Sequence, residues 1–274
     1  MSRQGFDDPS AFKPASFCGA LARSGKRSAS SESAQNWSAV ARLRRRRYFR
    51  YGCLFLLPFL ILALFVAIAP ERLTAMDIWL SEDILEHRMP WLTVLMRVIT
   101  EMAGIPFLIL LVIIASWLFW TLSHHCTVTF WFMSTVVLGT VMMNPLLKLL
   151  FHRPRPNPAF RLVVETTNSF PSGHSLSSIL VYGALAYGLY YLSRRRRGWN
   201  PRQFAIKAGA AAFSLLVAYS RVYLGAHYMS DVIAGLSLGT SLLYFSLSLS
   251  MNRLAFFQER AAEEARKKRT ANQS

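Results

Sequence analysis

Charged residues are scarce in this chain, at 16% of the sequence, whereas a soluble domain carries about 25%. Acidic residues are the scarcest of them, with 14 Asp and Glu against 31 Lys and Arg. Cysteine is rarer still. Cys18, Cys53 and Cys126 have neither the spacing of a metal site nor that of a disulfide framework. The composition therefore disfavours an ordinary soluble domain and a disulfide-stabilised secreted one, and we expect the three thiols to be inert.

Long apolar runs are abundant instead, and 53% of the residues are hydrophobic. Six runs are long enough to cross about 30 Å of hydrocarbon at about 1.5 Å per residue. Six buried helices in one soluble core would be unusual for 274 residues. We therefore expect an all-α polytopic membrane protein. The expected transmembrane helices are residues 51–69, 105–122, 127–150, 175–192, 205–224 and 232–251.

The segment between the first two spans, residues 70–104, has a mixed character. Its acidic residues and Pro90 exclude another span, whereas Ile78, Trp79 and Trp91 provide apolar positions. We expect one or two amphipathic helices that lie in the membrane interface.

Both ends of the chain are polar and basic. Residues 1–40 are rich in Ser, Ala, Lys and Arg without helical or strand periodicity, which is typical of disorder. We therefore expect a disordered basic tail at 1–47, a membrane domain at 48–252 and a second basic tail at 253–274. The start also resembles a signal peptide, but its apolar run exceeds the usual length of about 7–15 residues, and a proline follows. An uncleaved first span is the better interpretation.

The positive charge is distributed unevenly along the chain. With six spans and both termini inside, 23 of the 31 Lys and Arg and 6 of the 14 acidic residues fall on the inner side. This bias follows the positive-inside rule and predicts cytoplasmic termini in the cell (inner) membrane. Anionic lipid and topology explain the arginine clusters, and no nucleic-acid recognition motif accompanies them. We expect no nucleic-acid partner.

Three short polar stretches interrupt the apolar chain at the ends of spans. With the topology above, all three face the outer (periplasmic) side. Charged groups near hydrocarbon are costly, at about 2.5–3.5 kcal/mol each at the bilayer centre, so a shared anion would explain why they gather at one depth. The stretches are Lys148-Leu-Leu-Phe-His-Arg-Pro-Arg155-Pro156, Pro171-Ser172-Gly173-His174, and Ser220-Arg221 followed by His227 and Asp231.

The residue types in these stretches suit phosphoryl chemistry. Pro171-Ser172-Gly173 predicts a helix start whose free N–H groups face an anion, with His174 in the first turn. His227 and Asp231 share a helix face, so that the carboxylate can fix the imidazole tautomer and leave the other nitrogen free to attack. Lys148, Arg155 and Arg221 can neutralise the phosphoryl oxygens.

Taken together, the stretches resemble the signature of the type-2 phosphatidic acid phosphatase superfamily, K-x6-RP, PSGH and SR-x5-H-x3-D. Every position of the signature matches, and the resemblance covers roughly residues 50–253. It implies that His227 is the nucleophile, that Asp231 supports it and that His174 protonates the leaving oxygen. It also implies that Lys148, Arg155, Ser172, Gly173 and Arg221 bind the phosphate. No metal or other cofactor is expected, and the motifs themselves lack a carboxylate cluster.

The resemblance implies a lipid phosphate or lipid diphosphate as substrate, and undecaprenyl diphosphate is favoured over phosphatidate, phosphatidylglycerophosphate and lipid A. Phosphotransfer to a second lipid, or a catalytically silent lipid-binding protein, are the alternatives. Loss of a signature residue would indicate the silent protein, and none is lost. The oligomeric state stays open.

Four further polar residues lie in or near these stretches without a signature role. We expect His152 and Arg153 to be solvent-facing loop residues and Asn144 to bridge helices. Glu165 is the only acidic residue in the 152–170 loop, and the pattern assigns it no function.

Overall fold

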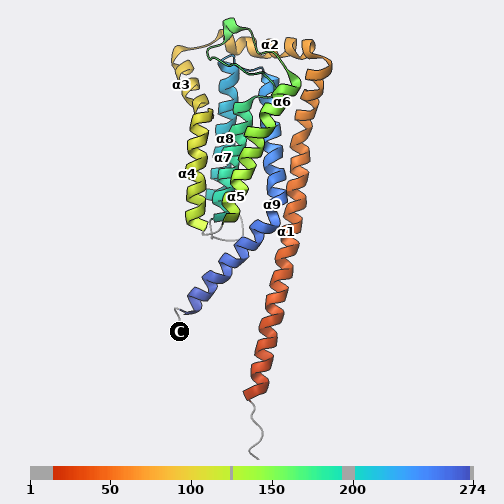
Figure 1. Ribbon diagram of the computed structural model, residues 1–274, viewed down its shortest axis with the longest axis vertical. Coiled ribbons are helices and arrows are strands. Elements are labelled where there is room, and N and C mark those ends of the chain that lie inside the picture. Colours follow the sequence, from red (N-terminus) through yellow and green to blue (C-terminus); the bar gives the residue numbers. More distant parts are fainter. Residues whose placement is uncertain (1–14, 124–125, 193–200, 272–274) are drawn as a thin grey trace, which may run out of the picture.

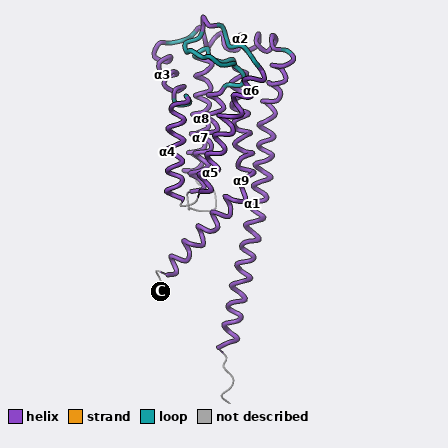
Figure 2. Tube along the Cα trace, in the orientation of Figure 1, coloured by secondary structure: helices purple, strands orange, loops and turns teal. Residues whose placement is uncertain are grey.

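The computed structural model describes residues 15–123, 126–192 and 201–271, and it describes side chains for residues 40–122, 126–192 and 201–250. Over these ranges all regular structure is helical, as predicted (Figure 2). The elements in chain order are α1 (Ala15–Ile68), α2 (Pro70–Glu86), α3 (Pro90–Glu101), α4 (Ile105–Ser123), α5 (Cys126–Val136), the π-helix η2 (Val137–Met143), α6 (Asn144–Phe151), the 3₁₀ turn η3 (Pro158–Phe160), α7 (Gly173–Leu192), α8 (Pro201–Tyr223) and α9 (Met229–Ala271).

Six helical segments in the described part of the chain are long and apolar enough to cross a membrane, which confirms the predicted number. The third of them is built from α5, η2 and α6 in series. The segments are Val40–Ile68, Ile105–Leu122, Cys126–Phe151, Gly173–Leu192, Pro201–Tyr223 and Met229–Ser250.

Helices α7 and α9 form the centre of the bundle. More than half of each span is buried inside the protein, compared with 17% of the α4 span. Helix α7 packs against α8, α9 and α5, and α1 lies along α9 (Figure 1). Serine, glycine and alanine recur along the buried face of α7, and such small residues allow helices to approach closely.

Two glycines bring α9 against the start of α7. A Cβ atom at Gly235 would lie 2.6 Å from the carbonyl oxygen of Ser172, and one at Gly239 would lie 2.2 Å from Cγ2 of Ile179. Residues 235 and 239 therefore form the close packing surface that their small-xxx-small spacing predicts. This approach places the two helix ends that carry the second and third motifs side by side.

Helix α2 lies across one end of the bundle, as expected of an interfacial helix, whereas α3 descends along the bundle into α4 (Figure 1). The amphipathicity of α2 has an unusual direction. Its buried residues include the polar Asp77 and Ser81, while Ile78 and Trp79 are exposed, the latter at 73%. Leu73 is buried as well, so the inner face of α2 mixes apolar and polar residues, while several of its apolar side chains point away from the protein.

The helix α1 begins at Ala15, where the composition predicted a disordered tail. No proline lies between Ala15 and Leu57. The apolar span supplies the costly helix nucleus, which can then extend through Ala, Arg, Lys and Ser. Residues 1–14 of the predicted tail lie outside the described residues. Helix α9 continues beyond its span to Ala271.

The third span changes its helical pitch before the first motif. Pro145 cannot donate a backbone hydrogen bond, and the turn before it is a π-helix in which the Asn144 N–H donates to the Gly139 carbonyl. Such π-turns commonly occur near functional sites. Asn144 lies against α7, since a Cβ atom at Gly173 would be 2.8 Å from its Nδ2. This contact between helices agrees with the bridging position expected for Asn144.

Candidate active site

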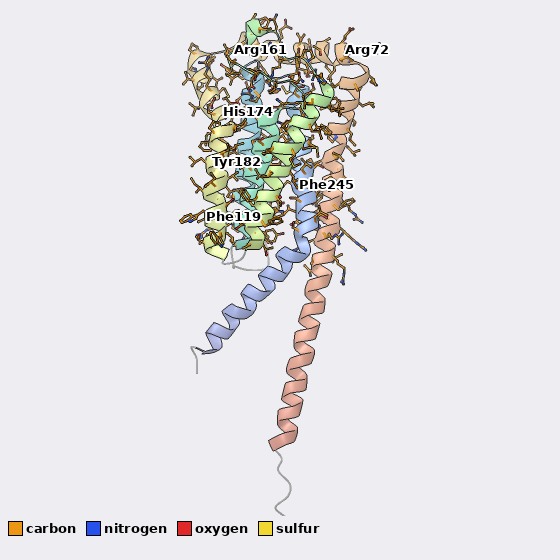
Figure 3. All side chains as sticks on the ribbon, in the orientation of Figure 1. Arg72, Phe119, Arg161, His174, Tyr182 and Phe245 are labelled. Carbon is orange, nitrogen blue, oxygen red and sulfur yellow. The ribbon has the colours of Figure 1, made fainter. Side chains whose placement is uncertain are left out.

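The three motifs converge at the end of the bundle that α2 covers. Lys148 lies in the last turn of α6, His174 in the first turn of α7, and Arg221 in the last turn of α8. His174 is labelled in this half of the bundle in Figure 3. Nη1 of Arg155, in the loop after α6, lies 3.2 Å from Nε2 of His227. This distance confirms the predicted meeting of the first and third motifs.

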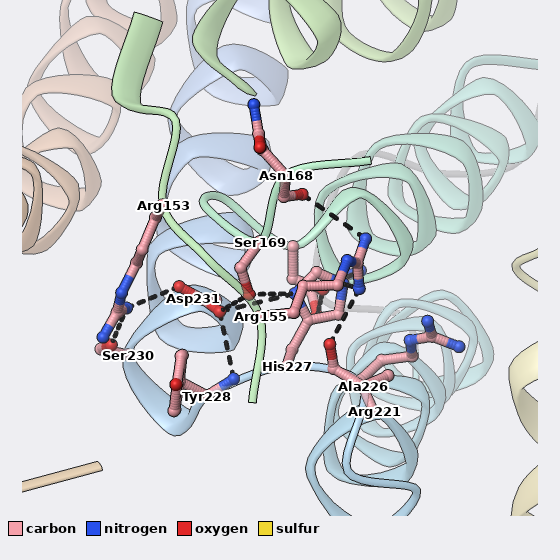
Figure 4. A network of polar contacts seen from close by, with 12 residues as sticks. Arg153, Arg155, Asn168, Ser169, Arg221, Ala226, His227, Tyr228, Ser230 and Asp231 are labelled. Atoms are coloured by element: carbon pink, nitrogen blue, oxygen red, sulfur yellow. Dashed lines mark hydrogen bonds and ion pairs between the residues drawn. The ribbon is translucent and has the colours of Figure 1, made fainter. Parts of the chain in front are cut away.

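His227 lies between Arg155 and Asp231 (Figure 4). Its Nδ1 is 3.5 Å from Oδ2 of Asp231 and 3.4 Å from Oγ of Ser169. A guanidinium group can only donate hydrogen bonds, so Nε2 beside Arg155 accepts and Nδ1 carries the proton. This tautomer leaves the Nε2 lone pair directed toward the cationic side of the site.

The position of His227 differs in one respect from the sequence interpretation. His227 precedes α9, which begins at Met229, so His227 and Asp231 do not share a helical turn. Asp231 instead lies at the third position of α9, where its Oδ2 accepts from the backbone N–H of Tyr228 at 3.0 Å. This hydrogen bond, from the backbone of the residue before the helix to the side chain of the third helical residue, is one of the two bonds of a capping box. It fixes the carboxylate beside the imidazole.

Burial and charge keep the imidazole of His227 neutral. The side chain is 2% exposed. Burial, followed by the nearby charges of Arg155, Arg221 and Lys148, holds the pKa of His227 well below its usual value. A neutral imidazole with a free Nε2 is the nucleophilic form, so His227 is in this form at neutral pH.

The three predicted cations surround loop residues 165–167. Glu165 pairs through one carboxylate oxygen with Nη2 of Arg155 at 3.3 Å and through the other with Nη2 of Arg221. Nζ of Lys148 donates to Oγ1 of Thr167 at 2.8 Å. Two guanidinium groups thus meet at a single carboxylate, and one of them, that of Arg155, also contacts Nε2 of His227. The sequence assigned no function to Glu165, although it was the only acidic residue of its loop.

The second motif begins a helix as predicted. Helix α7 starts at Gly173, and Oγ of Ser172 accepts from the backbone N–H of Ser175 at 3.5 Å. The backbone N–H of Ser172 donates to the carbonyl of Asp231 at 3.0 Å, which ties the second motif to the third. His174 lies within electrostatic range of the His227 ring and of Lys148, Arg155 and Arg221.

Arg153 corrects the sequence interpretation, which placed it in solvent. Its side chain is 3% exposed, and its Nη1 donates to Oδ1 of Asp231 at 2.6 Å. The guanidinium also lies over the ring of Tyr228, with Cζ 4.5 Å from the ring centroid. A charge this deeply buried needs a partner, and Asp231 provides one. His152, by contrast, is exposed as expected.

The sequence did not predict that two serines and one aspartate also belong to the site. Ser169 donates to Oδ2 of Asp231 at 2.5 Å, Ser230 accepts from Arg153 at 2.7 Å, and Asp77 of α2 pairs with Arg153 at 2.8 Å. The one available signal was Asp77, because a carboxylate among Met, Ile and Trp in an interfacial segment has no obvious reason to be there. No pattern could have indicated that its partner is 76 residues away.

The described side chains include neither a paired cysteine nor a cluster of metal-binding groups. Cys53 and Cys126 are free and exposed, and Cys18 lies where side chains are not described. Within the described ranges no group of three or more His, Cys, Asp and Glu side chains could bind a metal ion.

A neutral imidazole beside converging cations in a membrane bundle suits phosphoryl transfer, which needs mainly positioning and charge stabilisation. Comparison with known proteins specifies the class further. Residues 129–255 match the family model described as the PAP2 superfamily. A crystal structure of a transmembrane PAP2-type phosphatidylglycerolphosphate phosphatase from Bacillus subtilis superposes with a TM-score of 0.64 at 31% identity, covering 72% of this chain and 94% of that one.

Curated relatives agree with this match. Phosphatidylglycerophosphatase B of Bacillus subtilis is 37% identical over 68% of this chain and 88% of its own length. An undecaprenyl-diphosphatase of the same organism is 30% identical over 56% of this chain and 72% of its own length. An undecaprenyl-diphosphatase of Sulfolobus acidocaldarius is 31% identical over 74% of this chain and 92% of its own length. The chain belongs to the PAP2 superfamily and is a membrane phosphatase of that family.

Proposed function

We propose that this protein hydrolyses the terminal phosphate of a membrane lipid through a phosphohistidine on His227. One observation supports the proposal most strongly. Arg155 and Arg221 converge on a single carboxylate, that of Glu165, and Nη1 of the same Arg155 lies 3.2 Å from Nε2 of His227. A phosphate group offers the same guanidinium groups more oxygens and more negative charge than a carboxylate. It can therefore displace Glu165 from the two arginines and place its phosphorus where Nε2 of His227 can attack it.

The first half-reaction forms the phosphoenzyme. The negative charge of the bound phosphate favours a protonated His174. The Nε2 lone pair of His227 attacks phosphorus, the bond from phosphorus to the lipid oxygen breaks, and the protonated His174 gives its proton to that oxygen. Lys148, Arg155 and Arg221, with Ser172 and the Gly173 amide, stabilise the charge on the phosphoryl oxygens. The imidazole becomes cationic in this step, and Asp231 on the Nδ1 side offsets the new charge.

The second half-reaction releases inorganic phosphate. A water oxygen attacks phosphorus and passes a proton to His174, which was left neutral by the first step. The bond between phosphorus and nitrogen breaks, and its electron pair returns to Nε2. Both halves use only side chains that the three motifs bring together.

The substrate we favour is undecaprenyl diphosphate, with phosphatidylglycerophosphate as the second candidate. The names of relatives at 30–37% identity include both activities. The site lies at the end of the bundle opposite the basic extensions of α1 and α9 (Figure 1). With the positive-inside rule, this arrangement directs the site to the outer face of the cell membrane, where a carrier lipid diphosphate would be recycled.

A lipid panel in the presence of a chelator tests this function. Phosphate release by the purified protein should be retained in excess EDTA, because the side chains named above supply all the charge stabilisation. Undecaprenyl diphosphate should be hydrolysed with the highest kcat/KM among undecaprenyl diphosphate, phosphatidylglycerophosphate, phosphatidate and lipid A. A loss of activity that zinc or magnesium restores would contradict the mechanism. Appearance of phosphate on a second lipid instead of in water would show a phosphotransferase.

Replacing His174 separates leaving-group protonation from the other steps. His174→Ala should slow the reaction most for poor leaving groups, such as the alkoxide of a phosphate monoester, and least for aryl phosphates whose phenols are acidic. General acid catalysis of this kind contributes about 10²–10⁴-fold. The measurement is kcat/KM against leaving-group pKa for the wild type and the variant. An equal loss for all leaving groups would show that His174 does not donate the proton.

A further inference from the structure

A second buried carboxylate lies behind the catalytic one. Asp77 of the interfacial helix α2 is fully buried, as is Asp231. Arg153 lies between them, with Nη1 2.6 Å from Oδ1 of Asp231 and Nη2 2.8 Å from Oδ2 of Asp77. Figure 4 shows Arg153 on the side of Asp231 that faces away from His227. The order in space is therefore imidazole, carboxylate, guanidinium, carboxylate.

We propose that Asp77 is a positioning residue for the nucleophile, acting on His227 through Arg153 and Asp231. This inference rests on the proposed function, since it concerns the histidine that would attack phosphorus. Asp77 lies outside residues 129–255, where the family model matches, and none of the three motifs contains it.

The charges in this network explain why a second carboxylate is needed. Alone with Arg153, Asp231 would form a closed ion pair whose negative charge is largely neutralised. With Asp77 on the other side, one guanidinium pairs with two carboxylates, so Asp77, Arg153 and Asp231 together keep a net negative charge. That negative charge stabilises the imidazolium that develops when Nε2 of His227 is phosphorylated. The effect is strong because all three side chains are excluded from solvent.

Asp77 also fixes the start of the helix that carries Asp231. Its Oδ1 accepts from the backbone N–H of Ser230 at 2.8 Å, and its Oδ2 accepts from the Ser230 hydroxyl at 2.5 Å. Ser230 is the second residue of α9, and N–H groups in this turn have no partner within the helix. A carboxylate from α2 thus takes the part that an N-cap side chain usually plays. It sets the position of Asp231 at the next residue.

These contacts make α2 part of the catalytic apparatus. The inner face of the helix contains the apolar Leu73 but also Asp77 and Ser81, while Trp79 and Ile78 point outward. A helix that merely covered the bundle would place apolar residues along its whole inner face. The contacts of Asp77 with Arg153 and Ser230 therefore give a reason for its burial that packing alone does not.

The variant Asp77→Asn tests the proposal with a matched control on the same helix. Asp83→Asn makes the same change at a side chain that is 90% exposed. Asp77→Asn leaves Arg153 and Asp231 as a neutral pair, so no unpaired buried charge opposes folding. We expect kcat to fall by about 10–100-fold, the loss typical when a hydrogen-bond partner that orients a metal-bound histidine is removed. The KM and the inhibition constant of inorganic phosphate should stay within about twofold, because Asp77 does not touch the phosphate-binding cations.

Each outcome decides the question. A kcat equal to that of Asp83→Asn overturns the proposal, and so does a parallel change in kcat, KM and phosphate inhibition, which would indicate a structural role. If Asp77→Asn does not fold, Asp77→Glu is measured in the same way. This variant keeps the negative charge but shifts its position, and an unchanged kcat there also overturns the proposal.

As a further check, Arg153→Gln should be less active than Asp77→Asn combined with Arg153→Gln, since the single change leaves two buried carboxylates without a cation. No phosphate release from the wild type would instead refute the proposed function itself.

Discussion

Replacing His227 with alanine should abolish phosphate release. Among the described side chains, His227 is the histidine whose ring nitrogen contacts a phosphate-binding guanidinium, that of Arg155. Arg155, 3.2 Å from Nε2, and Arg221 can only donate hydrogen bonds. We expect kcat to fall by at least about 10⁴-fold, the scale found when an enzyme loses its nucleophile. Phosphate release from the favoured lipid is the measurement.

The control for this variant is His152→Asn. His152 is exposed and adopts a left-handed backbone with a φ of 45°, which asparagine tolerates better than most residues. This variant should retain wild-type activity. If His227→Ala keeps more than about 1% of the wild-type kcat, another group attacks phosphorus, because this activity is far above the residual activity of an enzyme that has lost its nucleophile. Inorganic phosphate should still bind to the cationic side chains of a folded His227→Ala protein, and this binding distinguishes loss of chemistry from loss of the site.

Replacing Arg155 with alanine should have the second-largest effect. Its Nη1 lies beside Nε2 of His227 and its Nη2 pairs with Glu165, so a bound phosphoryl group contacts it both before and during attack. An arginine that stabilises transferring phosphoryl charge contributes about 10³–10⁵-fold. We expect kcat/KM to fall by about 10³-fold, the lower end of that range.

Arg155→Lys should give an intermediate loss, because the lysine keeps the charge but cannot contact the Ala226 carbonyl and the phosphate together as the guanidinium can. Arg72→Ala is the control. Arg72 is exposed on α2 at the same end of the bundle (Figure 3) and should be replaceable without effect. Activity of Arg155→Ala within about tenfold of the wild type would remove Arg155 from the transition state, because that loss is far below the usual contribution of such an arginine.

The meeting of the three motifs was predictable from the sequence because charge in an apolar chain is costly. Lys148, Arg155, Arg221 and His227 lie at span ends on one side, and only a common anion explains their shared depth. Gly235 and Gly239 also have the small-xxx-small spacing that is typical of close helix contacts. The structure adds that this contact places Ser172 against α9.

The support behind the nucleophile could not be predicted in the same way. Arg153 resembled a loop residue because Pro154 follows it and because it lies off the signature, and its burial depends on Asp77 far away in the chain. Glu165 lies in an irregular loop, where no periodicity indicates the direction of a side chain. Contacts of this kind follow from tertiary packing and not from local pattern.

The helical state of residues 15–47 could not be predicted for a different reason. The polar composition indicated disorder, yet the chain continues the helix that its apolar neighbour begins. Composition estimates whether a segment can fold alone, and this segment is joined to a span that already pays the cost of nucleation.

The most direct test of the central claim is to trap the covalent intermediate. Wild-type protein is mixed with a lipid carrying radiolabelled phosphate, quenched in alkali within the first turnover, and digested for mass spectrometry. We predict one phosphorylated residue, His227, with the acid-labile and alkali-stable bond of a phosphoramidate, and no label in His227→Ala. Label on a hydroxyl side chain, or phosphate release without any label on protein during turnover, would contradict the account.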